Sequence, residues 1–94
     1  MKKETRSDFS KKLEKKRKGI DLIDQKLLIL LNERFCIALE IGKMKKEVGK
    51  KIYDPKREKE VLERLNQKNR GPLKKEGLKK IFRTIMKACR RSQG

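Results

Sequence analysis

The sequence of 94 residues predicts an all-α protein with one long helix and two shorter helices. Between Gly19 and Val48, apolar residues recur every three or four positions, which is the pattern of one stripe of an amphipathic helix. The sequence lacks the alternating apolar runs that are typical of β-strands. Few apolar residues remain for a core, so we expect a partner chain to cover part of the long helix.

The long helix is predicted from about Ser10 to Val48, because Gly19 and Gly42 weaken a helix without having to end it. Gly42 is interpreted as a point of close helix approach rather than as a turn. A helix of almost 40 residues is about 60 Å long. The rest of a 94-residue monomer is too small to cover it, so the sequence favours a dimer.

Two shorter helices are predicted in the second half of the chain. A loop from Gly49 to Tyr53 leads to Asp54-Pro55, which reads as a helix N-cap followed by proline at the first helical position. The second helix is predicted from about Pro55 to Gln67. A turn at residues 69–72 then leads into a third helix from about Pro72 to Arg91.

The composition is strongly basic, with 30 Lys and Arg against 13 Asp and Glu, no His, and a formal net charge of +17. This charge predicts attraction to anions, from small carboxylates to nucleic acid. Residues 1–9 are predicted to be a flexible basic N-terminus, followed by one domain over residues 10–94.

The sequence indicates a cytoplasmic protein that needs no metal or cofactor. Cys36 and Cys89 do not have a metal-binding or CxxC spacing, and free thiols are the usual state in the cytoplasm. No apolar run approaches the length of a membrane span, so a membrane partner is not expected.

Two cations, Arg34 and Lys45, interrupt the apolar stripe of the long helix. They are eleven residues apart, so they point the same way and lie roughly 16 Å apart along the axis. A cation on a buried stripe is costly unless an anion meets it. The stripe alone leaves three readings open: both side chains reach out to water, pair with acidic residues of a neighbouring helix, or bind an anionic ligand.

Other polar residues share helix faces on the shorter elements. Asp54 and Glu58 are four residues apart with Arg57 beside them, and Cys89 and Gln93 are also four apart. Each has an ordinary explanation by itself: a helix cap for Asp54, surface charges for Arg57 and Glu58, and a fraying helix end for Gln93.

Taken together and in order, these residues resemble the all-helical chorismate mutases. The motifs of the resemblance are Arg17, IDQKLL from Ile23, ER at Glu33-Arg34, EIGKMK from Glu40, D-P-x-R-E from Asp54, and F-x-x-I-M-x-x-C-R-x-x-Q from Phe82. The resemblance covers about residues 13–93. It implies a three-helix protomer that intertwines with a second copy into a homodimer, and it implies the conversion of chorismate to prephenate on the route to phenylalanine and tyrosine.

The resemblance also implies roles for four residues that act on the reacting part of the substrate. Arg34 clamps a substrate carboxylate within its own subunit, whereas Arg17 enters the site from the other subunit. Lys45 reaches the ether oxygen and a carboxylate, and Gln93 donates a hydrogen bond to the ether oxygen from the opposite side.

Four further residues are implied in substrate binding. Asp54, through its backbone, and Glu58 hold the ring-hydroxyl end of the substrate, and Arg57 belongs to the same wall. Cys89 stands near a carboxylate, where the family usually has serine, and a thiol is only a weak donor.

The implied chemistry agrees with these residue types. The rearrangement is a pericyclic [3,3] shift of a dianion, so it requires no nucleophile, proton transfer or metal. Arginines orient the two carboxylates of the compact conformer. Lys45 and Gln93 stabilise the charge that develops on the ether oxygen.

Two alternative functions remain open at this point. An isochorismate pyruvate-lyase on the same scaffold would use a similar site and would release pyruvate. A basic helical protein that binds nucleic acid would show steeply salt-dependent affinity without turnover. The proposed site uses four of the 30 cations, and a solvated lysine-rich surface explains the rest, so nucleic acid is not the expected partner.

Overall fold

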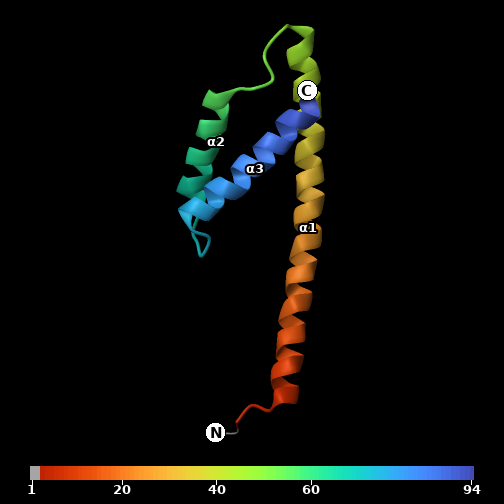
Figure 1. Cartoon of the computed structure of the whole chain (residues 1–94), viewed down its shortest axis with the longest axis vertical. Coiled ribbons are helices and arrows are strands. Elements are labelled where there is room, and N and C mark those ends of the chain that lie inside the picture. Colours follow the sequence, from red (N-terminus) through yellow and green to blue (C-terminus); the bar gives the residue numbers. More distant parts are fainter. Residues whose placement is uncertain (1–2) are drawn as a thin grey trace. The chain divides into compact units, whose positions relative to one another are not determined.

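The computed structural model describes residues 3–94 and forms three helices: α1 (Arg6–Glu47), α2 (Pro55–Lys68) and α3 (Lys75–Gln93) (Figure 1). No strand occurs in this described range. The predicted all-α class, with one long and two shorter helices, is therefore confirmed. The chain divides into two compact units, residues 1–34 and residues 35–94, with the division inside α1.

The N-terminal unit consists of the first part of α1, which begins four residues earlier than predicted. The backbone N–H of Asp8 donates to Thr5 Oγ1 and that of Phe9 to Thr5 O, both at 3.0 Å, so Thr5 caps the first turn. Ser10, the predicted start, lies inside the helix because the chain uses an earlier capping residue. The predicted flexibility of residues 1–9 stays a prediction, and Met1 and Lys2 lie outside the described residues.

The apolar side chains of the N-terminal unit are exposed. Among residues 3–34 none is buried, and Ile20, Ile23 and Leu27 each expose half or more of their surface. An ion pair of 2.8 Å joins Lys12 on α1 to Glu4, which precedes the helix. Residues 3–34 therefore carry an amphipathic stripe without a core of their own.

The C-terminal unit has a core, formed where α2 packs against α3 and where α3 meets the last turns of α1 (Figure 1). Its buried apolar residues are Ala38, Leu62, Leu78, Met86 and Cys89. Gly42 is buried as well, and a Cβ added there would lie 2.9 Å from Gln93 Cγ. The interpretation of Gly42 as a point of close helix approach is confirmed.

The start of α2 agrees with its sequence signals. The Asp54 side chain accepts a hydrogen bond of 3.0 Å from the backbone N–H of Arg57, and Pro55 occupies the first turn. At its other end α2 stops at Lys68, where the N–H of Asn69 still reaches Leu65 O.

The start of α3 does not agree with its sequence signals. It begins at Lys75 rather than Pro72, because the Asn69 side chain holds the preceding residues in a turn. The amide of Asn69 donates to Leu73 O at 2.7 Å and accepts from the Gly71 N–H at 2.9 Å. Gly71 has a φ of +71°, which glycine adopts at little cost.

No helix within residues 3–94 is both long enough and apolar enough to cross a membrane.

Candidate functional site

Lys45 is a half-buried cation near the end of α1. Its Nζ donates a hydrogen bond of 3.1 Å to the carbonyl oxygen of Ile52, in the loop that follows the helix. No carboxylate of residues 3–94 lies within ion-pair distance of this amine. A carbonyl orients an ammonium group without cancelling its charge, and it leaves two further N–H donors on the amine.

Gln93 is in the last turn of α3, and its side chain packs against α1. Its Nε2 donates to the backbone carbonyl of Ala38, and its side chain covers Gly42. Gly42 and Lys45 are three residues apart on the same helix, so Gln93 and Lys45 lie within one turn of each other on one face. The two residues predicted to act on the ether oxygen therefore lie on the same face of α1 in the C-terminal unit, and their joint action on one oxygen stays a prediction.

Asp54, Arg57 and Glu58 lie in the first turn of α2. The carboxylate of Asp54 caps the helix, and the backbone carbonyl oxygen of Asp54 accepts a hydrogen bond of 3.1 Å from the Glu58 N–H. The ordinary explanation of Asp54 as a cap is thus confirmed. Arg57 is exposed and Glu58 is half-buried.

Glu58 is joined to α3 by Arg90. The Nε atom of Arg90 lies 2.8 Å from Glu58 Oε2, and its guanidinium carbon lies 4.2 Å from the centre of the Tyr53 ring. This contact links the loop, α2 and α3 at one point. Glu58 is therefore more than a solvated surface charge.

Cys89 is 4% exposed and belongs to the core of the C-terminal unit. Cys36 is exposed, and neither residue forms a disulfide. The thiol of Cys89 thus has a packing role. Its predicted contact with a substrate carboxylate stays a prediction.

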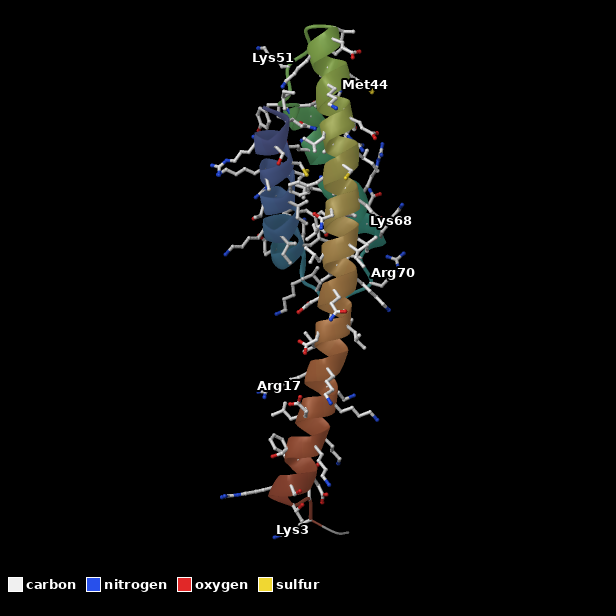
Figure 2. The ribbon with its side chains drawn as sticks, turned by 90° about the vertical axis from the view of Figure 1, so that its right-hand side faces the viewer. Lys3, Arg17, Met44, Lys51, Lys68 and Arg70 are labelled. Carbon is white, nitrogen blue, oxygen red and sulfur yellow. The ribbon has the colours of Figure 1, made fainter. Side chains whose placement is uncertain are left out.

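Arg17 and Arg34 belong to the N-terminal unit. Arg17 is exposed and projects from the N-terminal part of α1 (Figure 2), whereas Arg34 is half-buried. Their predicted roles as carboxylate clamps, one within a subunit and one across to the other, stay predictions.

Two residues of this region received no role from the sequence: Arg90 and Tyr53. Arg90 is part of the C-R-x-x-Q motif and lies one turn before Gln93, which places it on the same face of α3. Its contact with Glu58 depends on how α2 and α3 pack, and spacing along the chain does not predict such a contact.

The chain is similar to known proteins over most of its length. The model of the family described as chorismate mutase type II matches residues 16–94. A bifunctional chorismate mutase/prephenate dehydratase from Aquifex aeolicus is 40% identical over 81 residues, which are 82% of this chain and 22% of that protein. A chorismate mutase from Methanocaldococcus jannaschii is 41% identical over 56 residues, which are 60% of this chain and 57% of that protein.

The chain is also similar in fold to a solved structure. Chorismate mutase (Form II) from Thermus thermophilus superposes with a TM-score of 0.82 and is 40% identical, covering 83% of this chain and 89% of that one. The chain spans about one fifth of the length of the first bifunctional relatives that it matches.

Proposed function

The chain belongs to the chorismate mutase type II family, and on that premise we propose that it catalyses the rearrangement of chorismate to prephenate. The observation that carries the proposal is the placement of Lys45 and Gln93 on one face of α1. Both present N–H donors that backbone carbonyls already orient. Donors fixed in advance stabilise a developing negative charge without the cost of reorganisation.

The charge of the site suits a dianionic substrate. The partner of the Lys45 amine is a carbonyl and not a carboxylate, and in the proposed site Arg34 and Arg17 add two guanidinium groups that match carboxylates in geometry. Holding both carboxylates selects the compact conformer in which the two reacting carbons meet. The reaction then proceeds within the substrate.

The exposed stripe of α1 supports a homodimer. Ile20, Ile23 and Leu27 are between 50% and 57% exposed in the single chain, and a continuous apolar stripe of this kind marks a contact with another protein. In the proposed two-fold dimer the stripes of two copies cover each other, and Arg17 of one copy completes the site of the other. We expect this dimer in the cytoplasm.

The test is a direct assay of the purified protein with chorismate. The proposal predicts loss of chorismate absorbance with formation of prephenate, which acid converts to phenylpyruvate. The same protein is incubated with isochorismate, and pyruvate is measured. Pyruvate release in place of prephenate formation would support the lyase, and the absence of turnover with salt-dependent binding of nucleic acid would overturn the enzyme proposal.

A further inference from the structure

Three separate elements of the C-terminal unit meet at Arg90. Its Nε is 2.8 Å from Oε2 of Glu58 on α2, and its guanidinium stacks on Tyr53 in the loop, at 4.2 Å from the ring centre. The side chains of Arg90 and Glu58 are 32% and 20% exposed. Because both side chains are partly buried, solvent and salt screen their attraction less than that of an ion pair on the open surface.

The contact leaves Glu58 able to accept further hydrogen bonds. Nε of Arg90 is shielded from water, but no acceptor among residues 3–94 is aligned with its N–H, so its contact with Glu58 is mainly ionic. A carboxylate has about four lone-pair positions on its two oxygens. Arg90 approaches Oε2 and leaves other lone pairs for a ligand hydroxyl.

Arg90 also determines where the Glu58 carboxylate points. The backbone of Glu58 is fixed by the Asp54 cap, through the N–H of Glu58 to Asp54 O at 3.1 Å. A glutamate side chain still has three rotatable bonds, so a fixed backbone does not fix its carboxylate. Stacking on Tyr53 restrains the planar guanidinium of Arg90, which in turn restrains the carboxylate.

We propose that Arg90 is a positioning residue that holds the Glu58 carboxylate where it accepts a hydrogen bond from the ring hydroxyl of the substrate. The role of Glu58 rests on the proposed chorismate mutase function. The hydroxyl takes part in neither the bond that breaks nor the bond that forms. Its hydrogen bond therefore stabilises the ground state and the transition state about equally, and its loss raises KM more than it lowers kcat.

The experiment compares two substrates in five proteins: wild type, Arg90→Met, Glu58→Gln, the double variant, and Arg91→Met as a control. Arg91→Met removes an exposed charge from the same turn of α3. The substrates are chorismate and an analogue whose ring hydroxyl is replaced by hydrogen. Helix content and oligomeric state are measured for every variant.

For Arg90→Met we expect the KM for chorismate to rise about tenfold, the loss of one well-placed hydrogen bond, with kcat changed by less than about threefold. With the hydroxyl-free analogue, Arg90→Met and wild type should have the same kcat/KM. The double variant should be no weaker than Glu58→Gln alone, because both changes remove one interaction. Arg91→Met should behave as wild type.

Two further variants test the same proposal if Arg90→Met folds poorly. Arg90→Lys retains the charge but not the planar stacking group, so it should recover only part of the affinity for chorismate. Tyr53→Leu leaves Arg90 and Glu58 in place and should raise KM by less than Arg90→Met does.

The results separate this proposal from the function on which it rests. A wild-type protein that does not convert chorismate overturns both. A wild-type protein that does, with Arg90→Met either unaffected or weakened equally for both substrates, overturns only the role of Arg90. Equal weakening would mean that Arg90 supports the fold or contacts another part of the substrate.

Discussion

The two units of the chain differ in how much they complete by themselves. Residues 35–94 bury a core that includes Leu62, Leu78 and Met86, and within them Lys45, Gln93 and Glu58 all have defined partners. Residues 3–34 bury no side chain and present an exposed apolar stripe. The C-terminal unit therefore holds in place the groups that we propose to act on the ether oxygen and the ring hydroxyl, whereas the N-terminal unit carries the proposed carboxylate-binding arginines on a helix with an exposed apolar stripe.

The difference indicates a division of labour along α1. The groups proposed for the chemical step, Lys45 and Gln93, lie where backbone carbonyls and a helix crossing hold them. The arginines proposed to recognise carboxylates, Arg17 and Arg34, lie where a second chain is expected to complete the surface. Substitutions in the two units should therefore change the kinetic constants in different ways.

The largest effects are expected from removing one charge in each unit. Arg34→Ala and Lys45→Ala should each lower kcat/KM by at least about a hundredfold, the scale for losing one preorganised charged partner. Lys45→Ala should act mostly on kcat, because the charge on the ether oxygen develops only in the transition state. Steady-state kinetics measure both.

Lys46→Ala is the matched control for these variants, because Lys46 is an exposed cation on the same helix. It should keep wild-type kinetics. Near-normal turnover in Arg34→Ala or Lys45→Ala would place the site elsewhere.

An intermediate effect on catalysis is expected at Gly42 of the C-terminal unit. A Cβ at Gly42 would lie 2.9 Å from Gln93 Cγ and 3.0 Å from its Cβ, so Gly42→Ala must displace the Gln93 side chain. We expect kcat to fall at least about tenfold, because a small misplacement of a catalytic group is costly.

Gly19→Ala provides the contrast in the N-terminal unit. No atom lies within 4 Å of a Cβ added at Gly19. Alanine in an exposed helix interior stabilises it by about 0.5–1 kcal/mol, so thermal unfolding should shift upward while kcat/KM stays unchanged. Equal kinetics for the two alanine variants would contradict the role given to the contact between Gly42 and Gln93.

The smallest effect is expected at Cys89. A hydroxyl is a better hydrogen-bond donor than a thiol, so Cys89→Ser should leave KM unchanged or lower it by less than about tenfold. Because the residue is 4% exposed, the same change should reduce thermal stability. A collapse of activity in a folded Cys89→Ser protein would show that the thiol has a role of its own.

The sequence predicted the helices well where the signal lies in the residues of the helix itself. Asp54-Pro55 located the start of α2, and the apolar period located the single long helix. The start of α3 was wrong because the Asn69 side chain extends the turn by contacts that composition does not reveal. The start of α1 was wrong because several neighbouring residues can serve as a cap and Thr5 is the one used.

The candidate site was predictable in its residue types and less so in its contacts. Gly42 was recognised as a close approach because a glycine in a strong helix requires a reason. The link from Glu58 through Arg90 to Tyr53 could not be predicted, because it joins three elements whose packing is decided by the core. The placement of Arg17 depends on a second chain and stays a prediction.

The central claim is that each active site is shared between two chains, with Arg17 of one chain serving the site that contains Arg34 of the other. Arg17 and Arg34 are seventeen residues apart, so they point about 100° apart around the helix and should not serve one site from one chain. Homodimers of Arg17→Ala and of Arg34→Ala should both be nearly inactive. A hybrid of the two has one site with both arginines and one site with neither.

The decisive measurement is the activity of an equal mixture of the two variants after unfolding and refolding together. About half of the dimers should be hybrids, so about a quarter of wild-type sites should return. If the mixture stays as inactive as its parents while hybrid dimers are shown to form, Arg17 does not act across the dimer and the account of a shared site is wrong.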